Sequence, residues 1–105
     1  SFMELLKKNI NYNYMVLTNK QKFNIKHGLP KNQSHSIKSI SKLSGYTESS
    51  LRTVLSKGRG AYFSSPQSVR PHIKSPTEWG MARVYASINP TTKSHKIDKP
   101  NLKKK

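Results

Sequence analysis

Apolar residues recur every three or four positions through the middle of the chain, which is the spacing of one face of an α-helix. Ile37, Ile40 and Leu43 make the first row and predict a helix that starts near residue 36. Gly45 interrupts the pattern, and Thr47 offers a side-chain oxygen to cap a second helix, which we expect to end at residue 58. The buried side of this second helix is expected to hold Leu51, Val54 and Leu55.

Two further helices are predicted mainly from their capping residues. Thr18 is a candidate N-cap for a helix over residues 19–27. Ser75 is followed by a proline and, three positions on, by Glu78, which together form the signature of a capping box. This second signature predicts a helix over residues 76–88, ended by an Asn-Pro pair.

The segment after residue 57 has the composition of a loop with aromatic anchors. Gly58 is expected to cap the preceding helix, and Tyr62 and Phe63 are expected to fill the core. A phosphate-binding loop is the alternative for the two glycines, but the spacing lacks the preceding strand and the third glycine of a dinucleotide motif. Trp79, on the following helix, is expected in the core rather than as a stacking platform.

At 105 residues the chain is long enough for one small domain. We expect a mainly α fold with a helix-turn-helix-like centre in residues 18–90. Residues 1–17 are expected to be an N-terminal arm, in which Ser1 and Phe2 read as a cloning remnant before the natural start. Residues 91–105 are basic and broken by proline, so they are expected to form a flexible tail.

Charge is the strongest signal in the composition. Lys and Arg number 20 against 4 Asp and Glu, for a net charge of +16. Such an excess favours a polyanionic partner, and double-stranded DNA is the one we expect first. An anionic membrane is the weaker option, because no apolar run approaches the roughly 20 residues that span a bilayer.

The central helix pair suggests how DNA would be contacted. Two short helices around a glycine turn also occur in plain helical bundles, but with this charge they favour a DNA-binding helix-turn-helix. Arg52 would then be the best reader of a base, because its planar fork can bond a guanine in two places. The remaining residues would hold phosphates or line the groove. The predicted nucleic-acid contacts are Lys38, Lys42, Thr47, Ser49, Arg52, Thr53, Ser56, Lys57, Arg59, Arg70 and Lys74.

Arg83 has a different expected role. It lies at the edge of an apolar helix face, where a cation needs a partner. We expect it to act as a structural clamp, paired with Glu78 or with the carboxyl end of a helix. Arg70 could serve the same purpose, or, held extended before a proline, it could point at a fixed anionic target.

Residues for catalysis or metal binding are sparse. The chain has no cysteine, and its four acids are scattered along the sequence. The four histidines show no ligand spacing. We therefore predict no enzyme activity, no metal site and no cofactor. The alternative is a nuclease-like site formed by His72, Arg70 and Asp98.

The segment from residue 58 to 87 resembles a domain of unknown function found in small proteins of large DNA viruses and phages. The resemblance rests on Gly58, Gly60, Ala61, Tyr62, Pro66, Ser68, Val69, Arg70, Ser75, Trp79, Ala82, Arg83 and Val84. It implies a viral protein located in the virion, or in the nucleus or cytoplasmic factory of an infected cell. A DNA-binding role in packaging, replication or transcription is the first hypothesis. The alternative is a structural virion component, a minor capsid or internal cement protein that contacts other virion proteins; the oligomeric state stays open.

Overall fold

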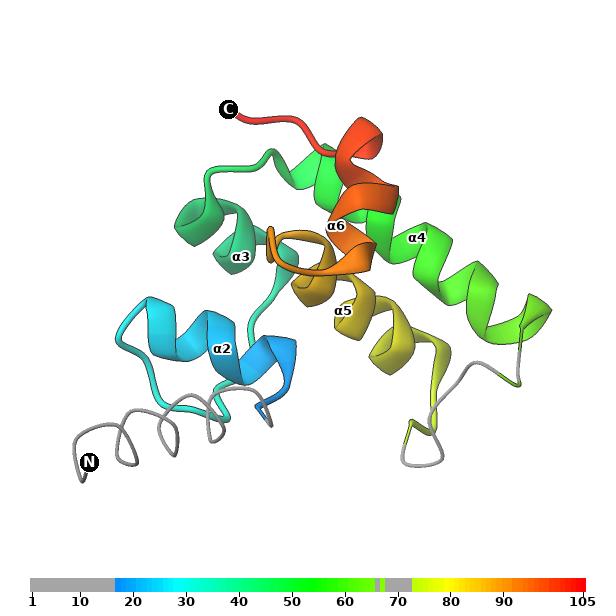
Figure 1. Ribbon diagram of the computed structural model, residues 1–105, viewed down its shortest axis with the longest axis horizontal. Helices are drawn as coiled ribbons and strands as arrows, with labels where there is room; N and C mark the ends of the chain where they lie inside the picture. The colour runs from blue at the N-terminus through cyan, green and yellow to red at the C-terminus, as the bar shows by residue number, and fades with distance from the viewer. Residues whose placement is uncertain (1–16, 66, 68–72) are drawn as a thin grey trace, which may run out of the picture. The chain divides into compact units, whose positions relative to one another are not determined.

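The computed structural model describes residues 17–65, 67 and 73–105. Within these ranges the protein is mainly helical, as predicted, and has no strand. The chain divides into two compact units, residues 1–33 and residues 34–105. The elements are α2 (Asn19–Lys26), α3 (Ile37–Ser44), α4 (Glu48–Ser64), α5 (Pro76–Ser87), α6 (Lys93–Asp98) and the short 3-10 helix η2 (Lys99–Asn101) (Figure 1).

The first unit is organised around α2, which begins at the predicted cap. The Thr18 hydroxyl accepts a hydrogen bond from the backbone N–H of Gln21, and the Gln21 side chain accepts one from the Thr18 N–H. Asn24 is fully buried, and its side-chain amide donates to the carbonyls of Lys31 and Gln33 at 2.9 Å each. These two bonds hold the chain that follows α2 against the helix.

α3 and α4 are joined by a tight turn. Gly45 has a φ of 80°, a left-handed conformation that favours glycine. The Ser41 hydroxyl donates to the Tyr46 carbonyl at 2.6 Å, and Thr47 caps α4 by accepting from the Ser50 N–H at 3.2 Å. The predicted order of helix, glycine turn and capped helix is therefore present. The same order occurs in helical bundles that bind no DNA, so the DNA-binding motif stays a prediction.

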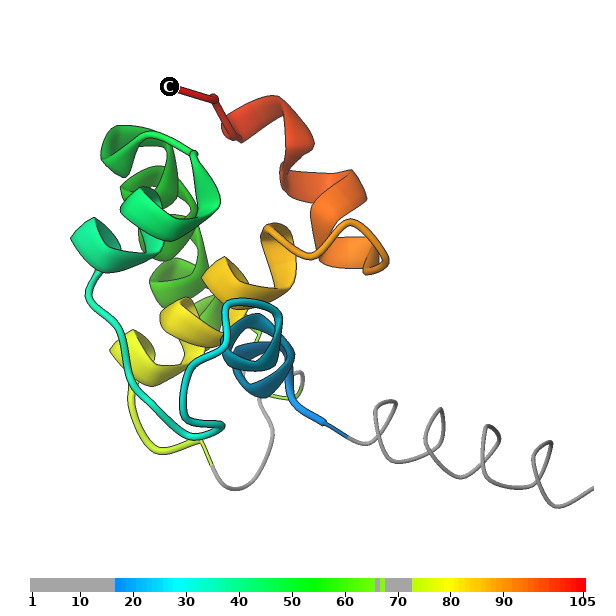
Figure 2. The same ribbon diagram turned by 90° about the vertical axis from the view of Figure 1, so that its left-hand side faces the viewer.

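α4 is longer than the sequence pattern predicts. The expected end at Gly58 is wrong, because the helix continues through Gly58 and Gly60 to Ser64. Gly58 instead lies where α4 packs closely on α5: a Cβ added there would lie 2.7 Å from the Cα of Gly80. Figures 1 and 2 show the two helices side by side (green and yellow). A glycine that resembles a helix end can equally permit close helix packing.

The extension of α4 also changes the setting of two aromatic residues. Tyr62 and Phe63, expected in a loop that fills the core, lie in the last turns of α4. The prediction is wrong for Phe63, which is 70% exposed. Tyr62 is half-buried, and its ring meets that of Phe63 edge-on, with 5.4 Å between the centroids.

The core of the second unit lies where α3, α4 and α5 meet. α5 begins as predicted: the Ser75 hydroxyl accepts from the Glu78 N–H at 3.1 Å. The Glu78 carboxylate accepts from the N–H of Lys74, one residue earlier than a capping box requires. Half-buried Trp79 follows in the first turn. The apolar side chains of the described residues that are fully excluded from solvent are Ile40, Leu51, Val54 and Val84.

The end of the chain is folded, so the prediction of a flexible tail over residues 91–105 is wrong. Thr92 caps α6 by accepting from the His95 N–H at 3.0 Å, and η2 follows directly. The last residues then run beside the turn between α3 and α4, with an antiparallel bridge between Tyr46 and Lys104. The composition of the segment favoured disorder because composition does not show that its single acid, Asp98, is buried and paired with Arg83 of α5.

Candidate nucleic-acid interface

Five of the predicted contact residues lie together on one face of α4. They are spaced three or four positions apart, and all are exposed. The opposite face of the helix carries the buried leucine and valine of the core. We call this set the outer face of α4. It consists of Ser49, Arg52, Thr53, Ser56 and Arg59.

The two arginines of the outer face have no ion-pair partner within the described parts of the chain. The stem of Arg59 packs on α5, since a Cβ at Gly80 would lie 3.1 Å from the Arg59 Cγ. Its head is exposed, as is that of Arg52. Both guanidinium groups are therefore available to bind an anion in two places.

The acids of the described chain are used elsewhere. Glu48 lies in the first turn of α4, where a negative charge favours the start of the helix. Glu78 accepts the Lys74 N–H at the start of α5, and Asp98 is buried in an ion pair. Glu48 lies one helical turn before Arg52, but within residues 17–65, 67 and 73–105 no ion pair joins an acid to the arginines of the outer face.

The side-chain hydroxyls of two predicted contact residues, Thr47 and Thr53, make hydrogen bonds within the fold. Thr47 caps α4 with its side chain, and its backbone N–H donates to the Lys103 carbonyl at 2.8 Å. The Thr53 hydroxyl donates to the Ser49 carbonyl, one turn earlier in the same helix, at 3.1 Å. Thr47 thus holds the turn together, whereas the Thr53 oxygen can still accept a hydrogen bond at the surface.

The remaining predicted contacts are not on the outer face of α4. Lys57 is exposed, but its charge lowers the pKa of Asp98, which places it on the side of α4 near that carboxylate. Lys38 and Lys42 are exposed on α3, four residues apart. Lys74 is exposed just before α5.

Arg70 lies outside the described residues, as does His72, so neither the predicted anion contact of Arg70 nor the nuclease-like arrangement is placed. Asp98, the third member of that arrangement, has a structural role. Its carboxylate is fully buried and bound to Arg83.

The C-terminal lysines form a second basic cluster, which sequence analysis assigned to a flexible tail. The Lys105 N–H donates to the Gly45 carbonyl at 2.9 Å, so this segment is fixed beside the turn that leads into α4. The Lys104 ammonium donates to the Ser44 carbonyl at 3.2 Å and lies 4.0 Å from the centre of the Tyr46 ring. Lys103, Lys104 and Lys105 are all exposed, which brings three cations to the beginning of α4.

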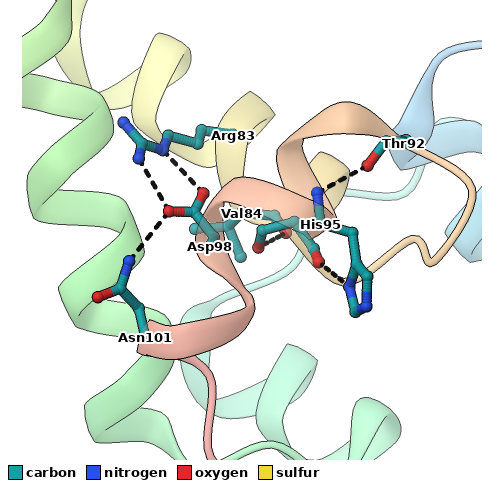
Figure 3. A network of polar contacts seen from close by, with 7 residues as sticks. Arg83, Val84, Thr92, His95, Asp98 and Asn101 are labelled. Atoms are coloured by element: carbon teal, nitrogen blue, oxygen red, sulfur yellow. Dashed lines mark hydrogen bonds and ion pairs between the residues drawn. The ribbon is translucent and has the colours of Figure 1, made fainter.

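Arg83 makes the structural clamp that its position at the edge of the apolar face predicted, but with a different partner. Its Nε and Nη2 donate to the two carboxylate oxygens of Asp98 at 2.9 and 2.8 Å, and Asn101 donates to the same carboxylate at 3.1 Å (Figure 3). We call this pair the Arg83–Asp98 clamp. It joins α5 to the end of α6. One turn earlier on the same face of α6, the His95 Nδ1 donates to the Ser87 carbonyl at 2.8 Å.

The clamp holds both groups in their charged forms. Burial by itself would raise the pKa of Asp98, because it disfavours the charged carboxylate. The hydrogen bonds and charge of Arg83 outweigh burial, with help from Asn101 and Lys57, so the pKa of Asp98 is lowered. The hydrogen bonds to Asp98 in turn raise the pKa of Arg83.

Phe63, which the sequence predicted in the core, is also exposed at the surface. It lies four residues after Arg59 and seven after Ser56, which is the spacing of the outer face of α4. This spacing is readable in the sequence once the helix is allowed to continue past Gly58.

Within residues 17–65, 67 and 73–105, no group of three or more His, Cys, Asp or Glu side chains is placed to hold a metal ion. None of the helices in these same ranges has both the length and the apolar character needed to cross a membrane.

The chain was compared with protein-family models, with curated proteins and with solved structures, and nothing matched in any of the three comparisons. The likeness to small viral proteins therefore stays a prediction.

Proposed function

We propose that this protein binds nucleic acid, and duplex DNA first, through the outer face of α4. One observation carries the proposal: two arginines and three hydroxyl side chains share one exposed helix face, and neither arginine has an ion-pair partner in the described chain. Arginine and hydroxyl side chains are among those that bind phosphate oxygens and base edges.

The neighbouring lysines support the same partner. Lys103, Lys104 and Lys105 lie beside the turn that leads into α4, and their charge adds to that of the outer face. Positive charges close together on a surface raise the local concentration of a polyanion and speed its association. They contribute affinity without sequence preference.

The experiment is a fluorescence-anisotropy titration of a labelled duplex at several salt concentrations. For the parent protein, the logarithm of the binding constant is expected to fall linearly with the logarithm of the salt concentration, by about 0.9 for each phosphate neutralised. Arg59→Ala should weaken all duplexes alike and reduce this slope by about 1, as expected for a phosphate contact.

Arg52→Ala tests base reading. If Arg52 bonds a base edge, the loss should be about 1–3 kcal/mol on the preferred sequence and smaller on others. An equal loss on all duplexes would limit Arg52 to phosphate contacts. Lys93→Ala is the matched control, because it removes one exposed cation at the start of α6 and leaves α4 unchanged.

The proposal fails if the parent protein binds duplex weakly, without saturation at a defined site size and without dependence on Arg52 or Arg59. That result would favour the structural virion role, which predicts co-purification with a capsid protein instead.

A further inference from the structure

Phe63 is an aromatic side chain that the fold exposes at the end of a basic helix face. It is 70% exposed, and within the described residues the only other large apolar side chains with comparable exposure are Ile25 and Ile97. The Tyr62 ring meets it edge-on, with 85° between the ring planes, which supports the Phe63 ring and still leaves much of it uncovered.

The position of Phe63 continues the outer face of α4. At a rise of about 1.5 Å per residue, its Cα lies roughly 6 Å along the helix axis from Arg59 and roughly 16 Å from Arg52. The close contact between Gly58 and Gly80 allows α4 to continue past α5 as an unbroken helix. The aromatic ring is therefore carried on the same rigid element as the two arginines.

We infer that Phe63 is a stacking platform for an unpaired base, so that the nucleic-acid site takes single-stranded DNA or RNA in addition to duplex. This inference rests on the proposed function and deepens it. Proteins that bind single strands combine cations along the backbone with aromatic rings on which bases stack. Arg59 supplies the cation for a phosphate, and Phe63, one helical turn away, supplies the ring.

The surroundings of Phe63 favour a nucleic acid over an apolar protein partner. The centre of a protein interface is a contiguous apolar patch, in which aromatic residues and arginine are enriched and serine is depleted. Phe63 instead shares its face with Arg52, Ser56 and Arg59, all exposed. A base inside a duplex is covered by its neighbours, so a ring on a helix surface can stack on an unpaired base but not on the paired bases within a duplex.

The test compares a single-stranded oligonucleotide, a blunt duplex and a duplex with a single-stranded overhang, all titrated by anisotropy. Phe63→Ala is expected to weaken the single strand and the overhang about tenfold and to leave the blunt duplex within about twofold. Phe63→Trp should bind the single strand about as tightly as the parent protein does. Its tryptophan fluorescence should be quenched by the single strand more strongly than that of the parent protein, which contains only Trp79. Ile97→Ala is the matched control, because it removes an exposed apolar side chain from α6.

Equal affinities of Phe63→Ala and the parent protein for the single strand, or an equal loss on all three ligands, would overturn the stacking role and leave the duplex proposal standing. A parent protein that binds none of the three ligands would overturn the proposed function, and the stacking inference with it. Stacking would also be contradicted if Phe63→Leu bound the single strand as tightly as Phe63→Trp does. That result would show that any apolar side chain at this position suffices.

Discussion

Positive charge is paired with a carboxylate on one side of α4 and is exposed without such a partner on the other. On the side that carries Gly58, Arg83 of the neighbouring helix α5 is bound by both oxygens of the fully buried Asp98 carboxylate, and Lys57 lies close enough to lower the pKa of that carboxylate. On the outer face, Arg52 and Arg59 are exposed without a carboxylate partner in the described chain. The comparison separates a cation that holds the fold from cations that are free to bind a partner.

The two sides of α4 also differ in the space that they leave at a glycine. Gly58 lies against Gly80 of α5 and has no room for a side chain, whereas a Cβ added at Gly60 would meet nothing within 4 Å. Two glycines only two residues apart therefore have unrelated roles, and the difference can be measured by substitution.

The largest effect is expected from breaking the Arg83–Asp98 clamp. Asp98→Ala should lower the free energy of unfolding by about 3 kcal/mol, because it leaves a partly buried guanidinium without its partner. Urea unfolding followed by circular dichroism measures the change. Arg52→Ala is the control, and its effect should stay within about 0.5 kcal/mol, as for an ordinary surface position. Equal stability of the two variants would contradict a structural role for the clamp.

A smaller loss is expected from Gly58→Ala. The added methyl group would lie 2.7 Å from the Gly80 Cα, so α4 and α5 must move apart, at a cost of about 1–3 kcal/mol. Gly60→Ala should instead stabilise the protein by up to about 1 kcal/mol, since alanine favours a helix over glycine and the site is open. The same urea titration distinguishes the two, and a gain for both variants would mean that the helices are not in close contact.

The smallest change in the free energy of unfolding is expected from lowering the pH. The folded-state pKa of Asp98 is lowered, so its contribution to stability is complete above the unfolded pKa of about 3.9 and is lost as the pH falls through the folded value. Unfolding free energies measured between pH 6 and pH 2 should therefore fall more steeply for the parent protein than for Asp98→Asn. Parallel curves would show that Asp98 is not the titrating group.

Local signals in the sequence predicted much of the fold. The caps Thr18, Thr47 and Ser75 begin helices as expected, and Gly45 makes the left-handed turn. These features depend on a residue and its neighbours within a few positions, so they are readable in one chain. The exposed face from Ser49 to Arg59 follows from the same periodicity, because the apolar residues of α4 determine which side points outward.

Contacts between distant segments decided the rest. Gly58 was expected to end a helix because the sequence does not indicate that Gly80 lies against it, and Phe63 was assigned to the core for the same reason. The C-terminal residues were expected to be flexible because their composition is basic, but Asp98 meets Arg83 and the last residues pair with the turn at Tyr46. The sequence by itself determined where α2, α3, α4 and α5 begin and which face of α4 is polar. Only the tertiary structure decided where α4 ends and which cations are neutralised, because both depend on residues that are far apart in the chain and adjacent in the fold.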